Sequence, residues 1–229
     1  LAYLPRKWVS LTGLIIGSLS PDFEYFFRMR IKSDYSHTLD GLFWFDLPLG
    51  LCLAFIFHNI VRDSLFHNLP TFFRSRFWAF GQFSWNDYFR RKWFVVVISI
   101  LIGAASHIFW DGFTHSQGYF VEKIPVLNRS VNIWDTQIPI LKILQHLSTL
   151  IGGSVIMLSI YKLPVQKDVE EDTNKKYWSI VGLLMLTIVV LRFLSGLEWQ
   201  QFGNVIVTVI AAGLLSVTLT PLILNKGKM

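Results

Sequence analysis

Six side chains that can bind a metal ion stand in or beside apolar segments of this sequence. They comprise two carboxylates and four imidazoles, namely Asp22, His37, His107, Asp111, His115 and His146. Ionisable groups are costly inside apolar helices and usually have a function there. Nitrogen and oxygen ligands together suit Zn²⁺, with Mn²⁺ or Fe²⁺ as the alternatives. The sequence therefore predicts a site for a divalent metal ion, with zinc as the first choice.

The spacing of His107, Asp111 and His115 predicts that they share one face of a helix. Each residue turns an α-helix by about 100°, so side chains four residues apart lie one turn apart and about 40° round the axis. His107 and Asp111 lie within an apolar run, which favours a functional role over a structural one. The alternatives are that His115 only ends this helix and that His146 only lies at a membrane interface.

Asp22 and Glu24 form a second candidate cluster, directly after a proline. Two residues apart, they would point to the same side of an extended chain. A carboxylate that does not bind the metal can take a proton from a water molecule, and we predict Glu24 as this catalytic base. The alternatives are a turn or helix-start role for Asp22 and a solvated loop position for Glu24.

The composition places these residues in a membrane protein. Of the 229 residues, 52% are hydrophobic and only 16% are charged, and the mean hydropathy is +0.46. A soluble domain has about 25% charged residues. The single cysteine, Cys52, excludes an internal disulfide and a cysteine-based metal site. Together these values exclude a secreted disulfide scaffold, a zinc finger and a soluble nucleotide-binding enzyme.

Apolar runs near the ~20 residues that cross a bilayer define the predicted helices. Five long runs cover residues 41–61, 94–114, 138–161, 177–197 and 203–224, and a short run covers residues 8–20. We predict an all-α, polytopic integral membrane helical bundle with five or six transmembrane helices, depending on whether the short run crosses. The predicted parts are a membrane core with the metal site at 1–161, a charged cytoplasmic linker at 162–176 and a C-terminal transmembrane hairpin at 177–229.

Lysine and arginine indicate how these helices are oriented. If all six runs cross, the side that carries the N-terminus holds 14 of these residues in its loops and the other side holds 6. Cytoplasmic loops carry the excess of basic residues, so both termini are predicted to be cytoplasmic. The loops at residues 28–40 and 117–134 then face outward, and all candidate ligands fall near this outward face.

Residues 62–93 interleave basic with aromatic side chains. Such a segment can stack on single-stranded nucleic acid, but it is more typical of an interfacial helix that lies on anionic lipid head groups. Nothing else in the sequence points to nucleic acid. We therefore expect membrane lipid as the partner and no nucleic acid.

Three runs of this sequence resemble an uncharacterised bacterial integral membrane family, the domain-of-unknown-function family 4184. The runs are residues 11–26, residues 36–38 and residues 103–115. That family is distantly similar to inner-membrane-bound metal-dependent hydrolases, which carry a Pro-Asp-x-Asp, a Thr-His-Ser and a His-x3-Asp element. The corresponding positions here are Pro21–Glu24, Ser36–Thr38 and His107–Asp111.

The resemblance implies a metal-dependent hydrolase in the bacterial cytoplasmic (inner) membrane. Two departures bear on the site. Relatives usually carry a His a few residues after the initiator Met, whereas this chain begins with Leu1, so we expect a preceding segment with one further ligand. Glu24 stands where the hydrolases have Asp.

The predicted function is metal-dependent hydrolysis of a membrane-associated ester or phosphoester. The substrate is expected to be a lipid or another small molecule. The alternatives are a non-enzymatic transporter and a structural membrane protein. A transporter would need polar groups that continue toward the cytoplasmic side, and residues 94–98, Phe-Val-Val-Val-Ile, are apolar.

Overall fold

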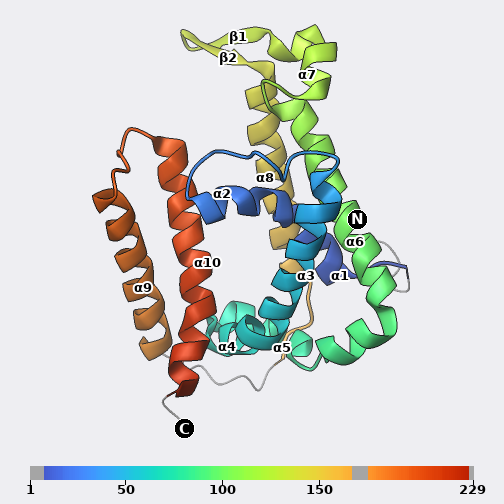
Figure 1. The fold of residues 1–229 in the computed structure, drawn as a ribbon, viewed down its shortest axis with the longest axis vertical. Helices are drawn as coiled ribbons and strands as arrows, with labels where there is room; N and C mark the ends of the chain where they lie inside the picture. Colours follow the sequence, from blue (N-terminus) through green and yellow to red (C-terminus); the bar gives the residue numbers. More distant parts are fainter. Residues whose placement is uncertain (1–7, 167–174, 227–229) are drawn as a thin grey trace. The chain divides into compact units, whose positions relative to one another are not determined.

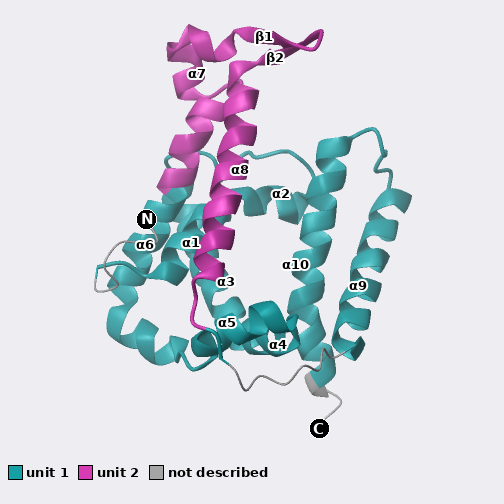
Figure 2. Ribbon diagram, turned by 180° about the vertical axis from the view of Figure 1, so that it is seen from behind, with its two compact units in different colours: residues 1–104, 165–229 teal, residues 105–164 magenta. Residues whose placement is uncertain are grey.

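The computed structural model describes residues 8–166 and 175–226 (Figure 1). The chain divides into two compact units (Figure 2). Unit 1 comprises residues 1–104 and 165–229, and unit 2 comprises residues 105–164. Helix α6, Trp85–Thr114, contributes to both units because the division falls within it.

The regular elements of unit 1 are helices throughout its described part. Those before α6 are α1 (Leu11–Leu19), η1 (Ser20–Asp22), α2 (Phe23–Arg28), η2 (Leu42–Asp46), α3 (Leu47–Ile56), η3 (Phe57–Val61), α4 (Arg62–Asn68) and α5 (Thr71–Gly81). Those at the end of the chain are α9 (Lys175–Leu194) and α10 (Phe202–Lys226). The π-helical segments η2 and η3 continue without a break into α3 and α4. Residues Leu42–Asn68 therefore form one helical stretch.

Five helical stretches of the described residues are long and apolar enough to cross a membrane. They are Leu42–Asn68, Trp85–Lys123, Ile140–Tyr161, Lys175–Leu194 and Phe202–Leu224. This confirms the predicted all-α polytopic membrane bundle and indicates an integral membrane protein. Helix α1 has only nine residues, about 13 Å at 1.5 Å per residue, which is less than half of the ~30 Å hydrocarbon core. The short run therefore adds no sixth span to the described part.

Helix α1 packs directly on α6 within unit 1. The backbone N–H of Ser10, at the start of α1, donates to Oγ of Ser99 at 2.8 Å. One helical turn further along α6, a Cβ on Gly103 would lie 2.7 Å from the backbone nitrogen of Ser18. The start of α1 thus contacts α6 near Ser99, and the end of α1 contacts α6 near Gly103, which comes later in the chain. The two helices therefore run in the same direction.

Replacing Gly103 by leucine is expected to destabilise unit 1, because the new side chain would overlap the backbone of α1 instead of a movable side chain. Overpacking of a tight contact costs about 1–3 kcal/mol. The measurement is the midpoint of thermal unfolding in detergent. Gly153→Leu in α8 is the matched control, since a Cβ there meets nothing within 4 Å. Equal losses in both variants would contradict the prediction.

The C-terminal helices α9 and α10 pack against each other in unit 1. Helix α10 also holds the segment that follows α2. The side chain of Asn204 accepts a hydrogen bond from the backbone N–H of Ile31 at 2.9 Å, and Oγ1 of Thr208 donates to the carbonyl of Met29 at 3.4 Å. Much of the predicted linker, residues 167–174, lies outside the described residues.

Unit 2 combines the end of α6 with a small hairpin and a long helix. Its further elements are α7 (Tyr119–Lys123), η4 (Pro125–Asn128), β1 (Ser130–Ile133), β2 (Thr136–Pro139) and α8 (Ile140–Tyr161). The strands are antiparallel, with Ile133 opposite Thr136. Trp134 and Asp135 form the turn between them, with φ of 47° and 62°, which is the left-handed conformation of a two-residue hairpin turn.

Candidate functional site

Asp22 and His37, two of the predicted ligands, lie together in unit 1. Asp22 ends η1, and His37 lies in the loop between α2 and η2. Nε2 of His37 is 3.8 Å from Oδ1 of Asp22. Two atoms at this separation can both reach one ion, because bonds from zinc to nitrogen or oxygen are about 2.0–2.2 Å long. The pair is therefore suited to hold part of a metal site.

The imidazole ring of His37 is held from its other side. Its Nδ1 lies 3.0 Å from Oγ of Ser33 and 2.9 Å from Oγ of Ser36. The ring also stacks on Tyr25, with centroids 5.1 Å apart. Partners at the second ring nitrogen fix the tautomer and orientation of metal-binding histidines. A proton on Nδ1 that is donated to a serine leaves the lone pair of Nε2 on the side of Asp22.

Ser33, Ser36 and Tyr25 are not among the predicted ligands. Their signal is present in the sequence, since the two serines stand four and one residues before His37. Hydroxyl groups at such short range can bond a ring nitrogen, but only the folded loop shows that both of them do so.

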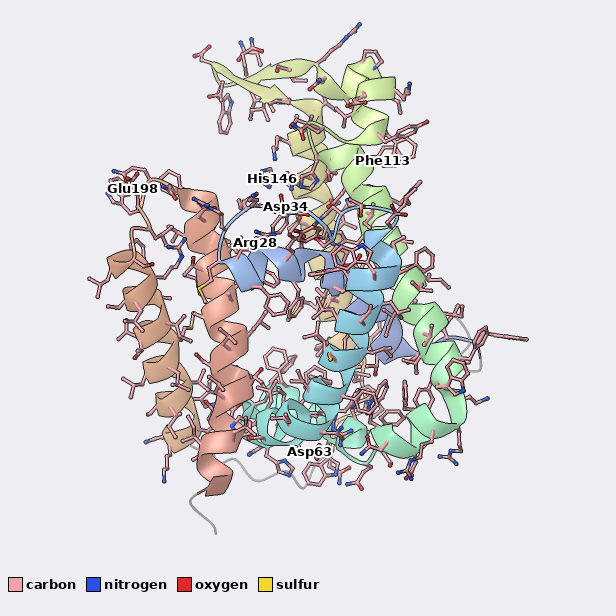
Figure 3. The ribbon with its side chains drawn as sticks, in the orientation of Figure 1. Arg28, Asp34, Asp63, Phe113, His146 and Glu198 are labelled. Carbon is pink, nitrogen blue, oxygen red and sulfur yellow. The ribbon has the colours of Figure 1, made fainter. Side chains whose placement is uncertain are left out.

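Glu24 anchors the loop that carries His37. Its carboxylate accepts hydrogen bonds from the backbone N–H groups of Asp34, Tyr35 and Ser36, at 2.9, 3.0 and 2.9 Å. It also accepts from Nε and Nη2 of Arg28, at 3.0 and 2.8 Å. Arg28 in turn pairs with Asp34 at 2.8 Å (Figure 3). Both carboxylate oxygens of Glu24 thus accept hydrogen bonds, and the residue is only 3% exposed to solvent.

These donors set the proton affinity of Glu24. Burial raises its pKa, but the three backbone N–H groups and Arg28 outweigh burial and lower the pKa from 4.5 to about 2. A carboxylate with so low a pKa is a weak proton acceptor at neutral pH. The geometry therefore favours a role for Glu24 in positioning His37 over the predicted role as catalytic base.

The predicted stripe of ligands is present on α6 and its end, in unit 2. Nε2 of His107 lies 3.2 Å from Oδ2 of Asp111, and Nδ1 of His115 lies 3.6 Å from Oδ1 of the same carboxylate. Asp111 therefore stands between the two imidazoles. His107 and Asp111 have side chains about one-fifth exposed, whereas His115 is about half exposed.

An open hollow of about 310 Å³ adjoins Asp111 within unit 2. It lies between the end of α6 and the first turns of α8, and its lining residues are Trp110, Asp111, Thr114, Gln145, Ser148 and Thr149. His146, the last predicted ligand, follows Gln145 on α8 (Figure 3). It is exposed and does not line this hollow.

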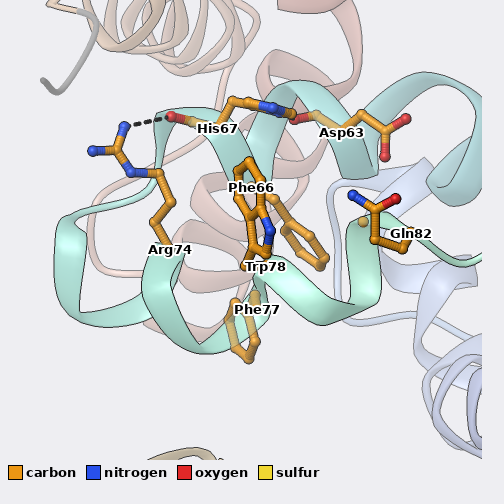
Figure 4. Close-up of a pocket in the computed structure, with 8 residues that line it drawn as sticks. Asp63, Phe66, His67, Arg74, Phe77, Trp78 and Gln82 are labelled. Carbon is orange, nitrogen blue, oxygen red and sulfur yellow. Dashed lines mark hydrogen bonds between the residues drawn. The ribbon is translucent and has the colours of Figure 1, made fainter. Parts of the chain in front are cut away.

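A smaller pocket of about 120 Å³ lies between α4 and α5 in unit 1 (Figure 4). Among its lining residues, Nη1 of Arg74 donates to the carbonyl of His67 at 3.1 Å, and the rings of Phe66 and Phe77 stack 5.3 Å apart. The predicted ligands do not line it. The basic and aromatic segment 62–93 thus forms α4, α5 and the start of α6, where a single interfacial helix was predicted.

Comparison with known proteins connects this geometry to a family. Residues 1–222 match the family described as a domain of unknown function (DUF4184). The chain matches no curated protein and no solved structure. The resemblance to this family is thereby confirmed, whereas the more distant likeness to metal-dependent hydrolases stays a prediction. Because the match covers nearly the whole chain, the protein belongs to the DUF4184 family.

Proposed function

We propose that this protein binds a divalent metal ion, zinc first, through Asp22, His37 and His107, and hydrolyses a membrane-associated ester or phosphoester. The arrangement of Asp22 and His37 carries the proposal. One carboxylate oxygen and one imidazole nitrogen lie 3.8 Å apart, and serine hydroxyls engage the second nitrogen of the ring. This donor set is the kind that zinc prefers.

Helix geometry supports His107 as the third ligand. Helices α1 and α6 run in the same direction, with Gly103 against Ser18. Four residues further along the chain in each case come His107 and Asp22. Both residues follow the contact between α1 and α6 at the same spacing along the chain, which is why the proposal includes His107 together with Asp22. The three residues together offer one carboxylate oxygen and two imidazole nitrogens.

Asp111 has the role of orienting His107 in this proposal, in place of direct ligation. Its Oδ2 lies 3.2 Å from Nε2 of His107, and a carboxylate at one ring nitrogen raises the basicity of the other. His115 and His146 stay predicted as additional ligands. A metal ion held by these residues would polarise an ester or phosphoryl oxygen and lower the pKa of a bound water to ~7.

The proposed location is the bacterial inner membrane, with the C-terminus in the cytoplasm. If the five long helices each cross the membrane in turn, the connections at 62–93 and 162–176 fall on the same side as the C-terminus. Together with the C-terminus itself, these segments hold 12 of the 21 Lys and Arg residues, which favours the cytoplasm for that side. The site residues then lie toward the outward face, at the level of lipid head groups. The predicted cytoplasmic N-terminus falls on residues 1–7, outside the described residues.

The test of this function is release of soluble head group from mixed lipid vesicles by the full-length protein with Zn²⁺ or Mn²⁺. Asp22→Asn is expected to lower turnover at least 100-fold, the loss typical of a disrupted metal site. Asp135→Asn is the matched control, because it makes the same change at an exposed turn whose φ of 62° asparagine also adopts. Metal-loaded protein that is inert toward a broad panel of lipids and esters would overturn the enzymatic proposal.

A further inference from the structure

The hollow beside Asp111 has a polar lining, although one of its walls is a helix that is otherwise apolar. Helix α8 is long and apolar enough to cross a membrane. Gln145, Ser148 and Thr149 nevertheless stand at positions i, i+3 and i+4, so they share one face. All three line the hollow. They lie about two turns from the start of α8 at Ile140, which is near the end of the span and not at its middle.

The hydroxyl groups that line the hollow can serve a ligand mainly as hydrogen-bond acceptors, because their protons are already donated. The hydroxyls of Ser148 and Thr149 both donate to the carbonyl of Gln145, at 2.9 Å each. A hydroxyl oxygen that has donated its proton can still accept. Nε1 of Trp110 uses one such position on Ser148, at 3.3 Å. The carboxylate of Asp111, which also contacts His107 and His115, lines the hollow as a further hydrogen-bond acceptor. Several acceptors that point from two helices suit a ligand with several hydroxyl groups.

The charged groups in and beside the hollow narrow the class of ligand that it can bind. Among the described residues, those that line it include a carboxylate and no Lys or Arg, which disfavours a bare phosphate as the group inside. Nζ of Lys142 lies just beside it, 2.8 Å from Oε1 of Gln145. This positive charge partly offsets the attraction of the Asp111 carboxylate for an ammonium group and favours a phosphate at the rim of the hollow. The indole of Trp110, which is 41% exposed, offers an apolar face for the C–H groups of a polyol.

We propose that this hollow binds the hydroxyl-bearing head group of a membrane phospholipid, of the glycerol or sugar class. What this binding would do for the reaction rests on the proposed function. Asp111 both lines the hollow and contacts His107, so a head group bound here selects which phosphoester reaches the proposed metal site.

Binding is measured without turnover, by native mass spectrometry of the full-length protein treated with a chelator. The probes are phosphatidylglycerol, phosphatidylethanolamine and phosphatidic acid, which share acyl chains and phosphate but differ in head group. Phosphatidylglycerol is expected to bind at least five-fold more tightly than the other two. Gln145→Leu and Ser148→Ala are each expected to bring the three lipids within about two-fold of one another.

Ser154→Ala is the matched control, because its hydroxyl bonds the carbonyl of Leu150 on the same helix at 2.8 Å and does not line the hollow. It should leave the preference for phosphatidylglycerol unchanged. Preference for phosphatidylethanolamine, no preference, or a preference that survives both hollow variants would overturn the inference. Displacement of the lipid by soluble glycerophosphoglycerol at equal concentration would overturn the assignment to a lipid.

The same preparations separate this inference from the proposed function. Zinc content and vesicle hydrolysis of the untreated protein test the metal site alone. Protein that prefers phosphatidylglycerol but holds no zinc would refute the hydrolase and leave the head-group site standing. Protein that holds zinc and hydrolyses lipids without head-group preference would refute the head-group site only.

Discussion

Replacing His37 or His107 by alanine is expected to lower the zinc affinity of the full-length protein at least 100-fold. Each change removes one of the three proposed ligands, and even the loss of an outer-shell partner costs metal sites about 10–100-fold in affinity. The measurement is zinc per protein after equilibration with a zinc buffer in detergent. His67→Ala is the control, since His67 is an exposed histidine whose Nδ1 bonds only a backbone carbonyl of its own helix among the contacts described.

A smaller loss on removal of a supporting side chain would show that the orientation of the His37 ring contributes to zinc affinity. Ser36→Ala removes a hydroxyl that lies 2.9 Å from Nδ1 of His37 and leaves the ligand itself in place. Its effect on zinc affinity should be about 10-fold, smaller than that of His37→Ala. Zinc content that stays the same in His37→Ala and His107→Ala would refute the metal site.

The second large effect is expected on stability at low pH, through Glu24. Its pKa is about 2 in the folded protein, against 4.5 for an ordinary glutamate. A group whose pKa is lowered by folding contributes stability above its unfolded pKa and loses it as the pH falls toward the folded pKa. A shift of this size corresponds to about 3 kcal/mol. The anchor of the His37 loop should therefore weaken between pH 4.5 and 2.

Glu24→Gln removes the charge that these donors stabilise. The variant is expected to unfold at a lower temperature than the wild type at pH 7, and the gap should narrow as the pH falls from 5 to 3. Scanning fluorimetry in detergent follows both proteins. Glu198→Gln, at an exposed glutamate (Figure 3), should behave as the wild type. A gap between Glu24→Gln and the wild type that is independent of pH would refute the role of the buried carboxylate.

The long apolar helices and the stripe on α6 could be predicted from the sequence, because both depend on local order. A run of about 20 apolar residues is helical in a membrane whatever its neighbours, since its backbone must satisfy its own hydrogen bonds. Within such a helix, a spacing of four residues is enough to place His107 beside Asp111 and Asp111 beside His115. The break in α6 at Lys92 also lies next to the predicted start of this span at residue 94.

Shorter elements could not be predicted in this way. The run at residues 8–20 was counted as a sixth candidate span, but its helix is only α1, followed by a 3₁₀ turn. The hairpin β1–β2 escaped prediction because Trp134 and Asp135 form its turn, whereas Asn-Gly and Asp-Gly are the residues that signal such turns. Pairing of the two strands supplies the hydrogen bonds that hold these residues in a left-handed conformation.

The sequence by itself determined the membrane bundle and the residue types of a metal site, because hydropathy and helical spacing are properties of neighbouring residues. Only the tertiary structure decided what each polar group does. Glu24 was a candidate base by its type, but the fold of the chain brings three backbone N–H groups, 10 to 12 residues away, onto its carboxylate. The hollow beside Asp111 likewise needs residues from α6 and α8 that are more than 30 positions apart. Such contacts depend on how the chain returns on itself, which residue type and spacing do not encode locally.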